Sequence, residues 1–274
     1  MEQRTIAFIG GGNMARSLIS GLLNAGHPAE RIHVTDLDQD KLAALSDEFG
    51  IQTSTDNAAA ARAAEVLVLA VKPQFMAEML EALTRELGSY GDKLVLSIAA
   101  GIRIARLSCL LGGHRNIVRA MPNTPALIGL GMTGLYAPGD VSVTDCTFAE
   151  QMLQAVGQTV WVASEAGLNN VIAASGSAPA YFFLFMQLMA EEAERMGFSA
   201  DQARLLVQQT ALGSAQMVID NPQLDLETLR AQVTSKGGTT AEAVRSFQEQ
   251  GLANLVSEAM RAAVKRAEEM EQLF

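Results

Sequence analysis

Three consecutive glycines near the start of the chain are spaced as a phosphate-binding turn requires. Residues 5–9 form an apolar segment, residues 10–12 are all glycine, and residues 14–25 have the periodicity of an amphipathic helix. Gly10 permits a tight turn from strand to helix, and Gly12 lets the backbone approach a pyrophosphate. Free N–H groups at a helix start bind anions. The pattern predicts a dinucleotide site, and the alternative is a flexible glycine loop.

A carboxylate follows the next predicted strand, residues 31–35. Asp36 lies about twenty residues beyond the glycines, where such a group commonly accepts hydrogen bonds from the adenosine ribose. We expect Thr35 and Asp36 at the cofactor, and we expect Asp36 to favour NADH because it and Asp38 would repel a 2′-phosphate. Lys41 is the nearest cation, and Thr35 with the N–H groups after it can still accept a phosphate, so the cofactor is NADPH or NADH. The alternative role of Asp36 is to cap the next helix.

Two further groups of residues follow predicted strands. Lys72 comes directly after the apolar run 66–71 and precedes Pro73, which ends a strand because it lacks an N–H. Ligands bind at the carboxyl edge of open α/β sheets, so we expect Lys72 to face the cofactor or substrate, with a solvated loop lysine as the alternative. The small residues 97–101 end the next strand and leave room for a nicotinamide against the backbone.

A loop of glycines and hydroxyl residues, 233–240, precedes a helical stretch in the second half of the chain. Successive N–H groups and the positive end of a helix dipole can hold a carboxylate without an arginine. Capping boxes beginning at Ser199 and Thr239 predict helix starts at both places. The alternative for the loop is an ordinary N-capped turn between helices.

Strand-like and helix-like segments alternate through the first part of the chain. The strands are apolar on both faces, which favours a parallel sheet covered by helices on each side. The predicted strands are residues 5–9, 31–35, 65–71, 93–98, 116–121, 131–137 and 158–162. After about residue 164, apolar residues recur at helical spacing instead. The sequence predicts an α/β protein with an N-terminal Rossmann-type doubly wound sheet, residues 1–163, and an all-helical C-terminal domain for substrate binding and dimerisation, residues 164–274.

Composition limits the classes of partner. The chain has 274 residues, 49% of them hydrophobic, and a formal net charge of −10, which disfavours nucleic acid and anionic membranes. The longest uncharged apolar run, residues 179–190, is too short to cross a bilayer, and no signal peptide is evident, so we expect a cytoplasmic protein. Two cysteines and three histidines show no metal-ligand spacing, and we expect no metal. The helical stretch 181–196 is apolar all round, which predicts burial in a homodimer or larger homo-oligomer.

Six segments, taken in order, resemble pyrroline-5-carboxylate reductase from one end of the chain to the other. They are residues 8–15, 69–74, 97–101, 118–125, 175–181 and 234–240. That family reduces the cyclic imine 1-pyrroline-5-carboxylate to L-proline with NAD(P)H, the last step of proline biosynthesis, and its C-terminal helices interlock into dimers. The resemblance implies the same oxidoreductase activity, small-molecule substrate and homo-oligomer here.

The resemblance also implies site residues. Those expected to contact the cofactor are Ile9, Gly10, Gly11, Gly12, Asn13, Met14, Asn57, Ala70, Val71, Lys72 and Pro73, with Ala99 and Ala100 near the nicotinamide. Those expected to contact the substrate are Met121, Ser235, Gly238, Thr239 and Thr240. Asp36 stands where many members of the family carry residues that suit a 2′-phosphate.

The expected reaction is hydride transfer from the nicotinamide to the imine carbon, with the protein supplying orientation. No histidine or carboxylate is an evident general acid, so Thr240 is the candidate to hydrogen-bond the ring nitrogen and relay a proton from water. One alternative is a related imine or β-hydroxyacid dehydrogenase, although the lysine or histidine base of the latter is not evident. Another is a nucleotide sensor or scaffold, which would have no need of the loop at 233–240.

Overall fold

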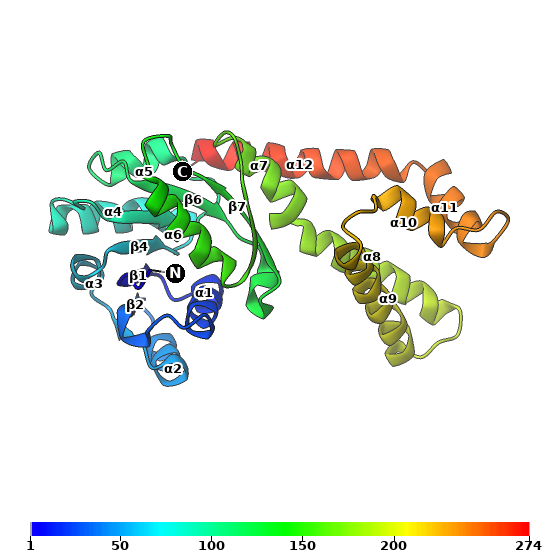
Figure 1. Cartoon of the computed structure of the whole chain (residues 1–274), viewed down its shortest axis with the longest axis horizontal. Coiled ribbons are helices and arrows are strands. Elements are labelled where there is room, and N and C mark those ends of the chain that lie inside the picture. The colour runs from blue at the N-terminus through cyan, green and yellow to red at the C-terminus, as the bar shows by residue number, and fades with distance from the viewer. Residues whose placement is uncertain (1, 274) are drawn as a thin grey trace. The chain divides into compact units, whose positions relative to one another are not determined.

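A computed structural model describes residues 2–273 and contains an eight-stranded sheet in the order β3-β2-β1-β4-β5-β6-β7-β8 (Figure 1). The strands are β1 Ile6–Ile9, β2 Ile32–Thr35, β3 Gln52–Ser54, β4 Val66–Leu69, β5 Leu94–Ser97, β6 Ile117–Met121, β7 Gly131–Tyr136 and β8 Gly157–Trp161. Strands β1 to β6 are parallel, β7 is antiparallel to β6, and β8 runs parallel to β7. The doubly wound sheet is confirmed. The sequence pattern missed β3, which is short and has no buried side chain.

Helices cover both faces of the parallel strands. Those on one face are α1 Asn13–Asn24, α2 Gln39–Phe49 and α6 Val143–Gln154, and those on the other are α3 Asn57–Ala63, α4 Pro73–Leu87 and α5 Ile104–Leu110. Along β1, Phe8 packs into the first layer and Ile9 into the second, and both are buried. Burial on both faces explains why these strands are continuous apolar runs.

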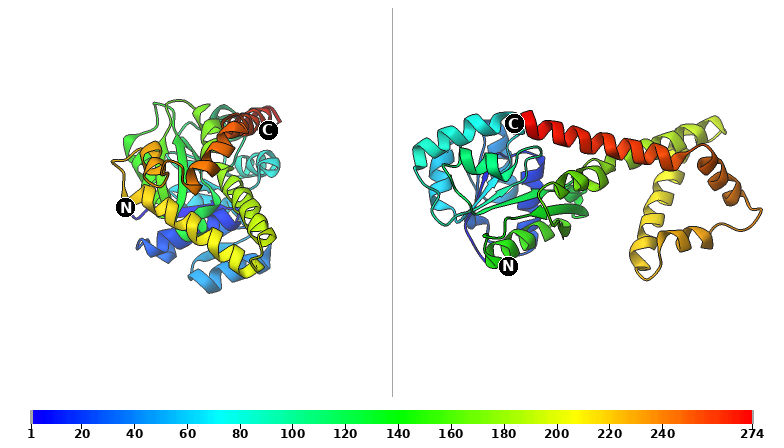
Figure 2. Two further views of the ribbon diagram at one scale, coloured as in Figure 1. Left: turned by 90° about the vertical axis from the view of Figure 1, so that its right-hand side faces the viewer. Right: turned by 90° about the horizontal axis from the view of Figure 1, so that it is seen from above.

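The chain is helical after β8 (Figure 2). The elements are α7 Gly167–Val171, a π-helical turn Ile172–Gly176, α8 Ala178–Arg195, α9 Ala200–Asp220, α10 Leu226–Gln232, α11 Thr239–Glu249 and α12 Leu252–Leu273. Short 3₁₀ turns lie at Ala29–Arg31 and Thr124–Ile128. Between Trp161 and residue 273 the structure contains no strand, so the predicted helical second part is confirmed.

Two compact units make up the chain. Met1–Ser177 together with Ala263–Phe274 form the first, and Ala178–Ala262 form the second. The end of α12 belongs to the first unit, where Glu271 accepts from Arg103 at 2.7 Å and its side chain is 3% exposed. The expected boundary between residues 163 and 164 falls just after the last strand and remains a prediction.

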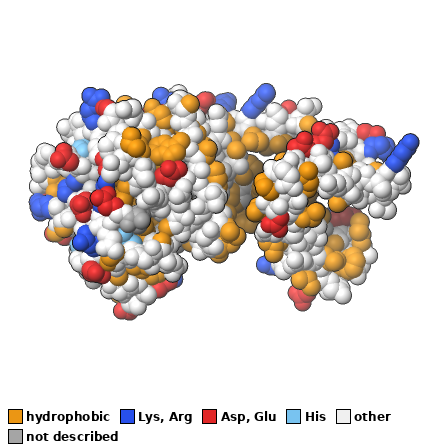
Figure 3. All heavy atoms as spheres, in the orientation of Figure 1, with side chains coloured by type: hydrophobic (Ala, Val, Ile, Leu, Met, Phe, Trp, Pro, Cys, Tyr) orange, Lys and Arg blue, Asp and Glu red, His pale blue; other side chains and the backbone are white. Residues whose placement is uncertain are grey.

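The helices of the second unit expose large apolar side chains, including Phe182 at 69% and Leu205 at 60% (Figure 3). The helical stretch Gly167–Arg195 is long and apolar enough to cross a membrane by length and composition, and 11% of its most apolar window is buried in the single chain. A helix covered by another subunit has the same composition. The expectation that no membrane is bound therefore stays a prediction.

Candidate functional site

The glycine turn lies at the carboxyl end of β1, between β2 and β4. The N–H of Gly10 donates to the carbonyl of Thr35 at 2.8 Å, and Gly10 has φ +104°. A Cβ on Gly10 would lie 2.8 Å from the carbonyl oxygen of Ala70, whereas a Cβ on Gly12 would meet no atom within 4 Å. Gly10 thus allows the close approach of two strands, and Gly12 borders open space. This division of roles matches the one expected for a pyrophosphate-binding turn.

Two of the expected cofactor residues are buried in the sheet. Thr35 is 0% exposed and its hydroxyl donates to the carbonyl of Phe8 at 3.4 Å, while Ile9 is 1% exposed. Their side chains hold the strands together and are not at the surface. Their backbones place Gly10, because the carbonyl of Thr35 accepts from it.

Asp36 directly follows β2 and stabilises the glycine turn through hydrogen bonds. Its Oδ2 accepts from the N–H of Gly11 at 2.8 Å and from Nζ of Lys41 at 2.9 Å, and its Oδ1 accepts from the N–H of Asp38 at 3.1 Å. Burial raises the pKa of this carboxyl, but the hydrogen bonds from Lys41, Gly11 and Asp38 outweigh it, so the pKa is lowered and Asp36 is ionised at neutral pH. The cap of α2 is Asp38, whose Oδ1 accepts from the N–H of Lys41. The alternative that Asp36 caps this helix is therefore wrong.

The carboxyl ends of β1, β4 and β5 meet at one edge of the sheet. The N–H of Ala70 donates to the carbonyl of Ile9 at 2.9 Å, and the N–H of Ile98 donates to that of Leu69 at 3.2 Å. Strand order reverses between β1 and β4, which is where open α/β sheets bind ligands. The expected residues at or beside this edge, following β3, β4 and β5, are Asn57, Ala70, Val71, Lys72, Pro73, Ala99 and Ala100.

Helix starts fall into two groups. Helices α2, α3, α6, α9 and α10 each begin at a side chain that accepts a backbone hydrogen bond. Helices α1, α4, α5, α7 and α11 begin at Gly12, Lys72, Arg103, Ala166 and Gly238, where the cap side chain accepts none. The starts of α5 and α7 belong to short helices, and the first N–H of α5, that of Ile104, donates to Glu165 instead. The starts of α1, α4 and α11 follow the motifs expected to bind the cofactor and the substrate. The first N–H groups of α1 and α11 are thus available to an anion, whereas in α4 Pro73 has no N–H and the N–H of Phe75 donates to the carbonyl of Lys72.

The expected substrate loop lies in the second unit, between α10 and α11. Gly237 has φ +72°, the N–H of Gly238 donates to the carbonyl of Ser235 at 3.0 Å, and Ser235, Thr239 and Thr240 are exposed. A Cβ on Gly238 would lie 2.5 Å from the hydroxyl of Ser235, so a side chain there would displace that hydroxyl.

Only one of the two expected capping boxes forms. The box of Ser199 and Gln202 is present and confirmed. The box at Thr239 is wrong, because Gly238 has extended φ and ψ and takes the cap position, which puts Thr239 inside the helix. The start of α11 therefore keeps its N–H groups free of side chains.

The sequence pattern missed a polar cluster around Asn123, which follows β6. Nδ2 of Asn123 donates to the carbonyl oxygen and the hydroxyl of Ser175 at 3.2 Å each, and Oδ1 accepts from the N–H of Met132 at 2.9 Å. Asn123 is 8% exposed. A Cβ on Gly176 would lie 3.2 Å from Cε of Met121, an expected substrate residue. Asn123 therefore fixes the turn after β6 to β7 and to the π-helical turn beside Met121.

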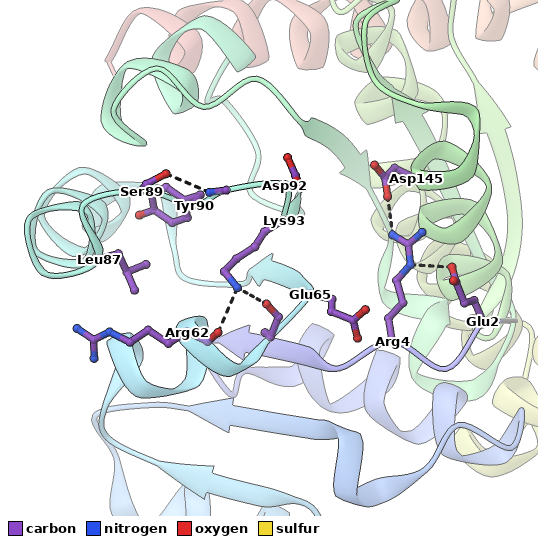
Figure 4. Close-up of a pocket in the computed structure, with 12 residues that line it drawn as sticks. Glu2, Arg4, Arg62, Glu65, Leu87, Ser89, Tyr90, Asp92, Lys93 and Asp145 are labelled. Atoms are coloured by element: carbon purple, nitrogen blue, oxygen red, sulfur yellow. Dashed lines mark hydrogen bonds and ion pairs between the residues drawn. The ribbon is translucent and has the colours of Figure 1, made fainter.

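A hollow of about 790 Å³ lies at the opposite, amino-terminal edge of the sheet (Figure 4). The lysine and arginine side chains that line this hollow already have hydrogen-bond or ion-pair partners. Nζ of Lys93 donates to the carbonyls of Arg62 and Ala64, and Arg4 pairs with Glu2 and Asp145. We assign it no ligand, since these contacts tie neighbouring segments together. Within residues 2–273 no group of three or more His, Cys, Asp or Glu side chains is placed to hold a metal ion.

The sheet order, the glycine turn and the carboxylate after β2 are those of a dinucleotide-binding protein of Rossmann type. Residues 5–101 match the model of the F420-dependent NADP oxidoreductases, and residues 165–270 match that of pyrroline-5-carboxylate reductase dimerisation. The chain is 54% identical to pyrroline-5-carboxylate reductase of Vibrio alginolyticus, over 100% of both chains.

Two solved structures are similar to this chain over almost its whole length. A pyrroline-5-carboxylate reductase from Coxiella burnetii is 41% identical with a TM-score of 0.92, covering 98% of this chain and 99% of its own. The Plasmodium falciparum pyrroline carboxylate reductase with NADP bound is 27% identical with a TM-score of 0.85, covering 99% of each chain. The chain belongs to the pyrroline-5-carboxylate reductase family. It is an oxidoreductase that uses NAD(P)H.

Proposed function

We propose that this chain reduces 1-pyrroline-5-carboxylate to L-proline with NAD(P)H. The observation that carries the proposal is the pair of uncapped helix starts, α1 in the first unit and α11 in the second. The cofactor and the substrate are both anions, and a chain of net charge −10 must bind them through local geometry.

The first unit supplies the cofactor site. The N–H groups from Gly12 to Met14 hold the pyrophosphate, and Asp36 lies at the adenosine ribose. Ala99 and Ala100 leave room for the nicotinamide against the backbone, and Lys72 and Pro73 border it at the start of α4. The bound nicotinamide supplies the hydride.

The second unit supplies the carboxylate site. The N–H group of Thr239 and the hydroxyl of Ser235 hold the substrate carboxylate, and Gly238, whose own N–H donates to the carbonyl of Ser235, forms the turn between them. The hydroxyl of Thr240 donates a hydrogen bond to the ring nitrogen. As the imine carbon gains a hydride the nitrogen gains a proton, and Thr240 relays that proton from water.

The working protein is a homodimer or larger homo-oligomer in the cytoplasm, without nucleic acid or membrane as a partner. Three observations support this: the dimerisation model covers residues 165–270, large apolar side chains are exposed on α8 and α9, and the net charge is −10.

Oxidation of NADPH or NADH with 1-pyrroline-5-carboxylate, measured together with proline, tests the proposal. We expect one proline for each nucleotide oxidised. A related dehydrogenase would instead prefer another imine or a hydroxyacid, and a sensor would bind the nucleotide without turnover. Either result would contradict the proposal.

Thr240→Val and Thr240→Ser test the proton relay. Valine removes the hydroxyl and should lower kcat by about a hundredfold, with little change in nucleotide affinity, whereas serine should retain most activity. If the valine variant turns over at the wild-type rate, Thr240 has no part in the reaction.

A further inference from the structure

A single cation on α2 contacts the carboxylate that follows β2. Residues 36–40 include Asp36, Asp38 and Asp40, and Lys41 is the only lysine or arginine between residues 32 and 50. Such a segment repels a phosphate unless a nearby cation compensates. Nζ of Lys41 lies 2.9 Å from Oδ2 of Asp36, at the end of β2.

Asp36 does not depend on Lys41 for its position. The N–H of Gly11 donates to the same oxygen at 2.8 Å, and the N–H of Asp38 donates to the other at 3.1 Å. When Lys41 leaves, the carboxylate therefore keeps two hydrogen bonds and stays turned toward the glycine turn.

Lys41 itself is free to move. Its side chain is 39% exposed, and it carries an ammonium on a flexible four-carbon stem. Moving the ammonium from Asp36 to a phosphate replaces one charge-assisted contact by another. Arg16, on α1, pairs with Glu48 at 2.6 Å, whereas Lys41 is the cation that contacts Asp36.

We propose that Lys41 determines the use of NADPH by this chain. Its ammonium moves from Asp36 to the 2′-phosphate when NADPH binds, and it stays paired with Asp36 when the cofactor is NADH. The inference rests on the proposed function, because it assumes a nicotinamide dinucleotide at the glycine turn. It predicts a protein that binds both cofactors, with Lys41 essential to one of them.

Equilibrium titration of NADPH and NADH against the nucleotide-free protein tests this without turnover. In Lys41→Met we expect NADPH affinity to fall by about tenfold or more, the loss of one charge-assisted contact, and NADH affinity to change by less than about threefold. Lys41→Arg should keep the wild-type preference. Lys265→Met, which removes an exposed charge from α12, serves as the control for net charge and should change neither affinity.

Competition experiments with 2′,5′-ADP and with 5′-ADP test whether Lys41 acts through the 2′-phosphate, because only the first nucleotide carries that group. Lys41→Met should weaken 2′,5′-ADP alone. Equal loss for both nucleotides, or no loss for NADPH, would overturn the role of Lys41. Failure of the wild-type protein to bind either nucleotide would contradict the proposed function itself.

Discussion

Gly10 and Gly12 stand two residues apart and have different physical requirements. Gly10 has a positive φ, and a Cβ there would lie 2.8 Å from the carbonyl oxygen of Ala70, so a side chain would strain the fold. Gly12 has φ −73° and faces open space. The fold requires glycine at position 10, and we propose that the cofactor requires it at position 12.

Gly10→Ala and Gly12→Ala should separate these requirements. We expect Gly10→Ala to lower the free energy of unfolding by about 1–3 kcal/mol or more, because positive φ and close contact both oppose a Cβ. Gly12→Ala should leave unfolding within about 0.5 kcal/mol of wild type but weaken NADPH binding by about tenfold or more. Urea unfolding and nucleotide titration measure the two effects. A reversed pattern would contradict the assignment of the pyrophosphate to this turn.

An asparagine lies just beyond each end of β6, one beside the proposed substrate residue Met121 and one at the opposite edge of the sheet. Asn123 follows the carboxyl end and fixes Ser175 and Met132. Asn116 precedes the amino end and donates to Asp145 at 2.9 Å. Both positions carry the same residue type, which makes them a matched pair.

Asn123→Ala should raise KM for 1-pyrroline-5-carboxylate and lower the free energy of unfolding by about 1–3 kcal/mol, because the Met132 N–H loses its acceptor and the turn beside Met121 loosens. The dissociation constant of NADPH should stay near its wild-type value. Asn116→Ala should reduce stability without changing KM. Equal KM values for the two variants would show that Asn123 has no positioning role.

Asp145 makes the stability of the fold depend on pH. Burial raises the pKa of its carboxyl, but hydrogen bonds from Arg4, Asn116 and Ser142 outweigh it and hold the pKa below its ordinary value. A carboxylate with a lowered pKa in the folded state stabilises the fold above its unfolded pKa of about 3.9, and this contribution is lost as the pH falls toward the folded pKa.

Asp145→Asn should therefore unfold more easily than the wild type at pH 7, and the difference should shrink below about pH 4. Asp140→Asn is the control, because Asp140 pairs with Arg115 at a more exposed position and should contribute about 0–1 kcal/mol at most. Urea unfolding across pH 3–7 measures both. A difference for Asp145→Asn that stays constant with pH would contradict the assignment.

Elements whose formation depends on local pattern were predictable from the sequence. The apolar run before Lys72 predicts β4, and the glycines predict the β1–α1 turn, since both signals are contained in a few neighbouring residues. The contacts of Asn123 join residues 52 positions apart and leave no periodic signal. The cap of α11 depended on whether Gly238 or Thr239 becomes extended, which the capping-box pattern decides wrongly here.

A single chain of this protein exposes large apolar side chains to water. Phe182, Phe183 and Leu184 are exposed on one helix, and self-association that buries them is favourable because it removes apolar area from water. The dimerisation model of the family covers that helix.

Phe182→Glu should weaken self-association, measured by sedimentation velocity over a range of protein concentrations. A buried, unpaired carboxylate is costly, so we expect the dissociation constant of the oligomer to rise by about a hundredfold or more. Val143→Glu is the control, because Val143 is 83% exposed but lies on α6, outside residues 165–270. Equal effects of the two substitutions would place the interface elsewhere.

The central proposal is that backbone amides at two helix starts bind two anions, one in each unit. A crystal structure of the protein with NADP⁺ and L-proline bound is the most direct measurement. We predict the pyrophosphate against Gly12 and Asn13 at the start of α1, and the proline carboxylate against residues 235–240 at the start of α11. Either ligand seated away from its helix start would contradict the account.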